Sequence, residues 1–285
     1  MSTTMSFRSS LLRPLAVAAL AFGLAAPALA ADGHGTSKPP REEWSFAGPF
    51  GTFDQAQVQR GFQVFKEVCS SCHAAHLVSF RNLAQPGGPS FSEAQAKAVA
   101  ESYQVQDGPN DAGDMFDRPG RLSDRWPSPF PNEQAARASN GGAYPPDFST
   151  LAKARTYEVG FPGFLIDIFT QYQENGVDYI HALLVGYEEP PEGFALPEGA
   201  HYNKYFPGHA IKMPQPLTDG QVTYTDGTPE TLDQYSRDVT AFMMWMAEPH
   251  LEARKRIGFQ VMIFLIIFAG LLYFTKKKVW KSVGH

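Results

Sequence analysis

The sequence predicts a mainly α-helical domain with long loops, followed by one C-terminal transmembrane helix. Apolar residues recur at helical spacing in several short segments, and 23 prolines and 25 glycines separate these segments. Residues Ile257 to Thr275 form an apolar run in which only Gln260 and Thr275 are clearly polar. At about 1.5 Å per residue this run spans roughly 28 Å, enough to cross a bilayer.

The charge of the 285-residue chain is unevenly distributed. The formal net charge is −5, but residues 31–253 contain 15 Lys and Arg against 29 Asp and Glu, a net charge of −14. This acidic balance excludes a nucleic-acid binder, which needs a basic excess along the phosphates. Aromatic residues make up 13% of the chain, and this argues against disorder across its middle part.

The N-terminus has the pattern of a secretory leader. Arg8 and Arg13 precede an apolar run from Leu15 to Leu24, and Ala28-Leu29-Ala30 offers the small residues that a signal peptidase reads. An uncleaved anchor is less favoured, because a bilayer span needs roughly 20 apolar residues. We expect four parts: a cleaved signal peptide at 1–30, an exported domain at 31–253, an anchor with basic flanks at 254–278 and a cytoplasmic tail at 279–285.

Within the exported domain the apolar spacing predicts five helices, at residues 53–69, 92–103, 164–172, 178–184 and 228–248. Asp54, Ser92 or Ser90, and Thr228 are the expected N-caps of the first, second and last of them. Pro249 should interrupt the chain before the membrane span. Residues 104–146 are rich in Pro and Gly and show no period, so we expect them to be loop.

The pentapeptide Cys69-Ser70-Ser71-Cys72-His73 carries the chemistry of the domain. A helical turn puts two thiols three residues apart on one face, where they can add to the two vinyl groups of one haem, and the adjacent imidazole then lies under the iron. The motif occurs once, so one covalently bound haem c is predicted. A zinc site would need two further ligands at short spacing, and a redox disulfide would usually accompany a βαβ pattern.

The second axial position of the iron separates electron transfer from gas or peroxide chemistry. Outside the leader, the membrane span and the last helix, the available methionines are Met115 and Met213. Met115 lies in an acidic loop, whereas Met213 follows an apolar pair and precedes two prolines that restrict the backbone. On spacing alone, four histidines remain alternatives: His76, His181, His201 and His209.

Six ordered motifs between Phe46 and the C-terminus resemble those of the bacterial cytochrome c1 family, the haem subunit of the quinol–cytochrome c oxidoreductase (bc1) complex. They are the haem motif, Asn140–Ser149, Tyr205–Met213, Asp226–Pro229, Trp245–Pro249 and Arg254–Arg256. The resemblance implies a class I cytochrome c-like haem domain in which Met213 is the second axial ligand beside His73. It also implies a set of haem-contacting residues: Asn140, Ala143, Pro145, Pro146, Arg155, Tyr179, Leu183, Phe206, Ile211 and Pro216.

The same resemblance implies a function. The chain would relay electrons from the Rieske iron–sulfur protein to a soluble or tethered cytochrome c, in respiratory or photosynthetic electron transport. It would act as the electron-transfer subunit of the oxidoreductase, without substrate chemistry of its own. Cytochrome b and the Rieske protein would be its partners in a dimeric complex of the bacterial inner membrane, with the haem domain in the periplasm.

The acidic charge of the exported domain would attract a basic cytochrome c, because opposite charges speed association. Two groups of residues are candidate docking acids: Glu188, Glu189 and Glu192, and Asp107, Asp111, Asp114 and Asp117.

Two other functions remain to be weighed. One is a membrane-anchored cytochrome subunit of a terminal oxidase, and the other is a haem protein with an exchangeable ligand site. The chain also departs from the family pattern in two ways. Residues 156–177 are longer than in the mitochondrial type, and with two cysteines in all, the chain cannot form the disulfide that braces the methionine region in some bacterial relatives.

Overall fold

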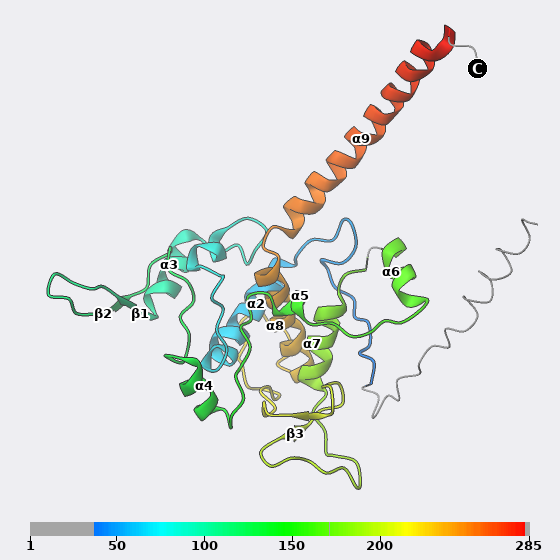
Figure 1. Ribbon diagram of the computed structural model, residues 1–285. Coiled ribbons are helices and arrows are strands. Elements are labelled where there is room, and N and C mark those ends of the chain that lie inside the picture. Colours follow the sequence, from blue (N-terminus) through cyan, green and yellow to red (C-terminus); the bar gives the residue numbers. More distant parts are fainter. Residues whose placement is uncertain (1–36, 171, 283–285) are drawn as a thin grey trace, which may run out of the picture. The chain divides into compact units, whose positions relative to one another are not determined.

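The core of the domain is a group of four helices, drawn at the centre of Figure 1, from which a long C-terminal helix departs. The computed structural model describes residues 37–170 and 172–282, so the predicted leader at 1–30 lies outside the described residues. The central helices are α2 (Gln55–Glu67), α5 (Leu151–Ala154), α7 (Asn175–Val185) and α8 (Leu232–Ala247). Around them lie α3 (Glu93–Glu101), α4 (Glu133–Ser139), α6 (Gly163–Thr170) and the short turns η1 (Cys69–Ser71) and η2 (Phe80–Ala84).

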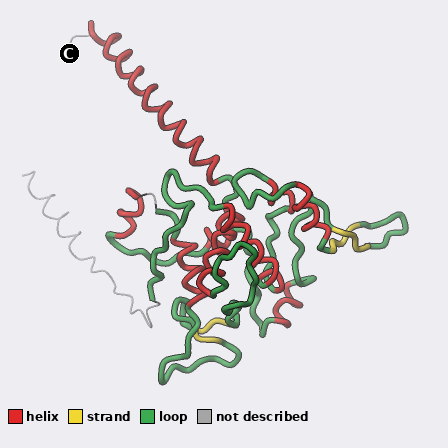
Figure 2. Tube along the Cα trace, turned by 180° about the vertical axis from the view of Figure 1, so that it is seen from behind, coloured by secondary structure: helices red, strands yellow, loops and turns green. Residues whose placement is uncertain are grey.

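The strands are few and short among the described residues, and loops connect most of the helices, as Figure 2 shows. Strand β1 (Gln104–Asp107) pairs antiparallel with β2 (Phe116–Pro119), and β3 (His201–Tyr202) pairs antiparallel with β4 (Ala210–Ile211). The chain ends in α9 (Leu251–Val279) and η3 (Trp280–Ser282). The mainly α-helical class with long loops is therefore confirmed.

The central contact of the fold is the crossing of α2 and α8. Gly61 lies at the crossing, where an added Cβ would be 2.0 Å from the backbone oxygen of Asp238. A larger residue there would push the two helices apart. Beside the crossing, the rings of Phe62 and Phe65 contact Phe242 at centroid distances of 5.7 and 5.5 Å, and Trp126 closes the cluster. The end of α2, where the haem motif begins, is thus held by the apolar core.

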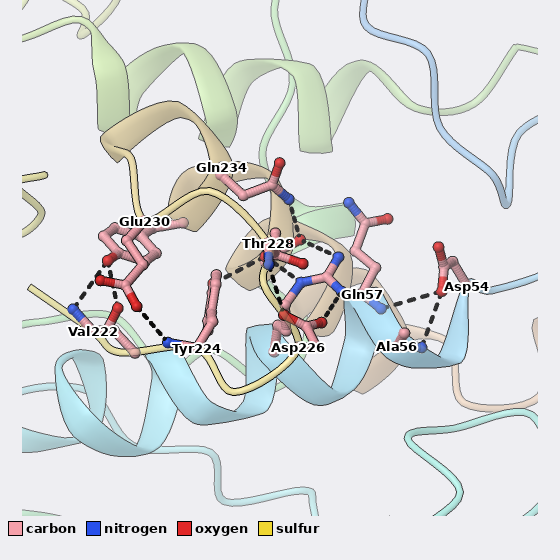
Figure 3. A network of polar contacts seen from close by, with 12 residues as sticks. Asp54, Ala56, Gln57, Val222, Tyr224, Asp226, Thr228, Glu230 and Gln234 are labelled. Carbon is pink, nitrogen blue, oxygen red and sulfur yellow. Dashed lines mark hydrogen bonds and ion pairs between the residues drawn. The ribbon is translucent and has the colours of Figure 1, made fainter. Parts of the chain in front are cut away.

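A buried polar network reinforces this crossing (Figure 3). Arg60 of α2 donates from Nε to Asp238 of α8 over 2.9 Å and from a terminal nitrogen to Asp226 over 2.9 Å. Asp238 is fully buried and also accepts from the Tyr224 hydroxyl at 2.9 Å and the Gln234 amide at 2.8 Å. Burial raises the pKa of Asp238, while the hydrogen bonds and the positive charge of Arg60 oppose that shift. The network joins α2, α8 and the loop between β4 and α8.

The prediction that residues 104–146 are entirely loop is wrong. They contain the β1–β2 hairpin and helix α4. Polar contacts hold the hairpin: Arg118 pairs with both Asp107 and Asp124, and the Asn110 side chain accepts backbone N–H groups within the turn. Because none of these contacts requires alternating apolar residues, the hairpin leaves no hydrophobic period in the sequence.

The predicted start of the last helix is also wrong, by about three residues. The N-cap of α8 is Thr231, whose side chain accepts the Gln234 N–H. Thr228 instead donates its backbone N–H to Asp226, and the Glu230 side chain accepts the Tyr224 N–H, so both belong to the preceding loop. The predicted caps Asp54 and Ser92 of α2 and α3 are confirmed.

Helix α9 is, among the described residues, the one helix long and apolar enough to span a membrane. It begins two residues after Pro249, which separates it from α8 as predicted. Its apolar side chains between Ile257 and Phe274 are exposed, as expected for contact with lipid. At its beginning the ring of Phe259 packs edge-on against Phe50 at a centroid distance of 5.5 Å.

The buried pair between Arg60 and Asp238 should dominate the stability of the crossing. Replacing Asp238 with Asn removes the charge but keeps the shape, and leaves Arg60 with Asp226 as its remaining partner. Breaking one side of a buried pair costs about 3–5 kcal/mol, and we expect a loss of about 3 kcal/mol in the free energy of unfolding. Denaturant unfolding of the full chain in detergent, followed by circular dichroism, measures it.

The matched control is Asp226→Asn, which changes the exposed member of the same network and should cause a smaller loss. Equal losses for the two variants would show that burial of Asp238 does not set the strength of the pair.

Candidate haem-binding site

The haem motif forms a tight turn directly after α2. The N–H groups of Cys72 and His73 donate to the Cys69 carbonyl at 3.1 and 2.9 Å, and residues 69–71 form the 3₁₀ turn η1. Cys72 is the C-cap of this turn, and the two thiols lie close enough for Cys72 to contribute to the pKa of Cys69. The turn is tighter than the expected α-helical one.

The two cysteines lack the additional ligands at short spacing that a structural zinc ion needs. Both thiols are half-buried, and burial, with a smaller contribution from Cys72, raises the pKa of Cys69 to about 12. Over residues 37–170 and 172–282, no cluster of three or more His, Cys, Asp or Glu side chains could hold a metal ion.

His73 is oriented by a backbone carbonyl. Its ring is buried, and its Nδ1 lies 2.8 Å from the carbonyl oxygen of Pro146, to which it donates in the neutral tautomer. The imidazole also stacks on Phe148 at a centroid distance of 4.2 Å. Burial lowers the pKa of His73 and so favours the neutral ring. This arrangement leaves the lone pair of Nε2 for a metal, as in metal-binding histidines whose other nitrogen donates to a carbonyl.

The loop that supplies this carbonyl is clamped to the haem motif. Phe148 donates its N–H to the Ala74 carbonyl at 2.8 Å, and the Asp147 carboxylate accepts the N–H of His76 at 2.8 Å. The Ser149 hydroxyl accepts the N–H of Leu77 at 2.9 Å. Two segments about 70 residues apart are therefore held together. The resemblance implied that residues of the Asn140–Ser149 loop contact the haem, and this geometry is consistent with that expectation.

Four predicted contact residues lie on this loop and are half-buried: Asn140, Ala143, Pro145 and Pro146. Asn140 donates its side-chain amide to the Ala136 carbonyl at 2.7 Å, so that amide caps α4. Gly141 and Gly142 follow at φ values of +58° and +87°, with nothing near their Cα hydrogens, so the left-handed backbone explains both glycines.

Met213 lies on a separate segment with its own supports. Its side chain is half-buried at the edge of the core, between buried Ile211 and buried Leu217. The Tyr187 hydroxyl donates to its backbone carbonyl at 3.1 Å. Buried Asn203 ties the preceding loop to α7, since its amide donates to the Leu183 carbonyl at 2.8 Å. Phe206 and Pro216, two further predicted contacts, are half-buried on this segment.

Arg155 lies near enough to Tyr179 for its charge to act on the tyrosine hydroxyl. Arg155 follows α5 and is exposed, and its positive charge partly offsets the increase in pKa that burial causes at Tyr179. Helix α5 packs directly on α7. The two backbones approach so closely at Gly176 that an added Cβ there would be 1.9 Å from the Ala152 carbonyl oxygen. The long segment between Arg155 and Tyr179 therefore leaves the domain at the end of α5 and returns to it at α7, where the two helices are in contact.

The alternative ligands are placed less favourably. Met115 is 53% exposed on the hairpin, and His201 is also exposed. The rings of His76, His181 and His209 contact Asp147, Ser236 and the Asn203 carbonyl respectively. Met243, Met244 and Met246 are buried in α8.

The two groups of candidate docking acids differ in their surroundings. Glu188, Glu189 and Glu192 are exposed directly after Tyr187, the residue that holds the Met213 segment. Asp111, Asp114 and Asp117 are exposed on the β1–β2 hairpin, which Figure 1 shows on another side of the core. Asp107 differs from these, because its pairing with Arg118 lowers its pKa and neutralises its charge locally.

Sequence reasoning missed the roles of Phe148 and Tyr187. Phe148 could have been found, since it lies in the Asn140–Ser149 motif, whereas a tyrosine that donates to a carbonyl 26 residues away leaves no local signal. The neighbouring thiols, the oriented imidazole and the half-buried Met213 segment together fit a covalently held haem.

Comparison with known proteins agrees with this assignment of the site. The model of the Cytochrome C1 family matches residues 44–283. "Cytochrome c1" of Blastochloris viridis is 55% identical over 273 residues, which cover 95% of this chain and 97% of that protein. "Cytochrome c1" of Rhodospirillum rubrum is 45% identical over 261 residues, covering 86% and 88% respectively.

A longer relative, "Cytochrome b/c1" of Bradyrhizobium diazoefficiens, is 67% identical over 248 residues. The match covers 87% of this chain, and the chain spans only 36% of the length of that relative. With a family model that covers most of its length and a haem motif held as described above, this chain belongs to the cytochrome c1 family.

Proposed function

We propose that this protein is a membrane-anchored c-type cytochrome of a bacterial bc1 complex. It relays single electrons from the Rieske iron–sulfur protein to a soluble or tethered cytochrome c, in respiratory or photosynthetic electron transport. The observation that carries this proposal is the His73 ring, whose Nδ1 is hydrogen-bonded to the Pro146 carbonyl and which follows two neighbouring thiols in one tight turn. Membership of the cytochrome c1 family favours this function over a terminal-oxidase subunit.

One haem c would be held by four side chains. Cys69 and Cys72 form the two thioether bonds, and His73 Nε2 and the Met213 sulfur are the axial ligands. A bound haem c supplies a one-electron iron couple, and a thioether ligand raises its reduction potential. Met213 itself is half-buried and packs against the apolar core. With both axial positions taken by the chain, no exchangeable site remains for an external ligand.

Arg155 and Tyr179 would contact the haem propionates. A guanidinium can bind a carboxylate through two parallel hydrogen bonds, so Arg155 would compensate a propionate charge at the edge of the domain. Tyr179 and Leu183 lie four residues apart on α7 and therefore on one face of that helix. That face would line the haem, with the Asn140–Pro146 loop, Phe206, Ile211 and Pro216 as further contacts.

The topology follows from the two ends of the chain. Residues 1–30 would be removed on export, and residues 31–253 would lie in the periplasm. Residues 254–278, which make up most of α9, would anchor the domain in the inner membrane. Residues 279–285 would remain in the cytoplasm. Cytochrome b and the Rieske protein would be neighbours in a dimeric complex, in which this chain is the electron-transfer subunit.

Covalent attachment is tested by removing one thiol. Cys69→Ser removes one of the two thiols that react with the haem vinyl groups, so normal attachment should fail and a haem stain of the denatured chain should be weaker than that of the unsubstituted chain. Ser70→Ala, within the same turn, is the control and should keep the full stain. An undiminished stain in Cys69→Ser would remove this cysteine from the attachment site.

Axial ligation is tested by potentiometry. Met213→Leu should leave the haem attached but lower the midpoint potential by hundreds of millivolts, on the scale that axial ligands set. Met115→Leu, which changes the exposed methionine of the hairpin, should leave the potential unchanged. An unchanged potential in Met213→Leu, or ready carbon monoxide binding by the reduced unsubstituted protein at neutral pH, would contradict the proposed ligation.

Docking is tested by the salt dependence of electron transfer to a basic cytochrome c. We expect Glu188, Glu189 and Glu192 to steer the carrier, because they follow Tyr187 at the Met213 segment. The rate should fall as ionic strength rises, and replacing all three with Gln should flatten that dependence. The equivalent Asn variant of Asp111, Asp114 and Asp117 is the matched control. If the hairpin variant flattens the dependence instead, docking occurs there.

A further inference from the structure

The segment around α6 exposes a large apolar surface. Phe161 and Phe169 are 80% and 86% exposed, and Phe164 and Ile166 are about half exposed. From Val159 to Thr170 the sequence contains one charged residue, Asp167. Contiguous apolar surface of this kind marks a membrane or protein contact in an otherwise soluble domain. We call these four side chains the α6 apolar surface.

The orientation of α6 is set by its polar side. Asp167 is buried and pairs with Arg41, whose guanidinium lies 4.4 Å above the ring of Tyr172. Tyr172 in turn donates its hydroxyl to buried Asp178 of α7. The one charged side of α6 therefore faces the domain, and the α6 apolar surface faces away from it. Figures 1 and 2 both show α6 set apart from the central helices.

The chain that follows α6 contacts the start of the membrane helix. Gln173 and Glu174 line a cavity together with Arg254, Lys255 and Phe259 of α9. Arg254 and Lys255 lie just before the apolar run of α9, where head groups are expected. The segment that follows α6 by a few residues therefore lies beside the part of α9 that enters the bilayer. This places the α6 apolar surface near the membrane surface. Phe50, 72% exposed and packed on Phe259, lies at the same level.

We propose that α6 is a second membrane contact, with the α6 apolar surface embedded in the outer part of the lipid leaflet next to the haem domain. Apolar aromatic side chains without exposed charge suit the boundary between head groups and acyl chains. Arg256, which is exposed at the start of α9, would attract anionic head groups to the same place. Together α6 and α9 would hold the domain at two points and limit its rotation about the axis of α9.

The test measures lipid exposure of α6 in the full chain. A nitroxide spin label is attached to Phe169→Cys or, in a second variant, to Phe161→Cys, and the holoprotein is placed in vesicles of phosphatidylcholine and phosphatidylglycerol. Collisions with oxygen, which partitions into lipid, are compared with collisions with a water-soluble nickel chelate. Both labels should collide preferentially with oxygen, with an oxygen-to-nickel ratio several-fold above that of the control.

The matched control is Phe116→Cys, an exposed phenylalanine of the β1–β2 hairpin, whose label should collide preferentially with the nickel chelate. The unsubstituted chain corrects for labelling at Cys69 and Cys72. Labels on α6 that collide mainly with nickel in these vesicles would overturn the proposal, and so would labels shielded from both reagents. If nickel access is lost only in the complete bc1 complex, the surface binds a protein partner instead of lipid.

Discussion

The buried pair between Arg60 and Asp238 is the constraint on which the rest of the domain depends. It fixes the crossing of α2 and α8 and draws in the loop that carries Tyr224 and Asp226. Cys69 follows Arg60 by nine residues, and Met213 precedes Tyr224 by eleven. Both segments that would flank the haem therefore extend from the crossing of α2 and α8. The absence of a side chain at Gly61 allows these two helices to approach closely enough for the Arg60–Asp238 pair to form.

The two sides of the proposed haem site are held by different means. On the histidine side, hydrogen bonds between residues 73–77 and residues 146–149 join two distant segments and orient the imidazole. On the methionine side, Tyr187 and Asn203 hold a proline-rich segment through its backbone and its preceding loop. These contacts hold the methionine segment in a chain whose two cysteines both lie in the haem motif.

Much of the fold was predictable because it depends on local signals. The caps Asp54 and Ser92, the interruption at Pro249 and the membrane span are visible in short stretches of sequence. The β1–β2 hairpin was not, since ion pairs at Arg118 hold it and leave no apolar period. The true cap of α8, Thr231, was missed because Thr228 and Glu230 have side-chain and backbone partners in the loop. Long-range partners such as Tyr187 and Met213 require the structure.

The central claim is that His73 and Met213 bind the same iron. Extended X-ray absorption fine structure at the iron edge of the purified full-length protein at neutral pH tests it most directly, because it counts sulfur and nitrogen neighbours. The account predicts a six-coordinate iron with five nitrogens, four from the porphyrin and one from His73, and a single sulfur. Six nitrogens, or a five-coordinate iron without sulfur, would contradict it.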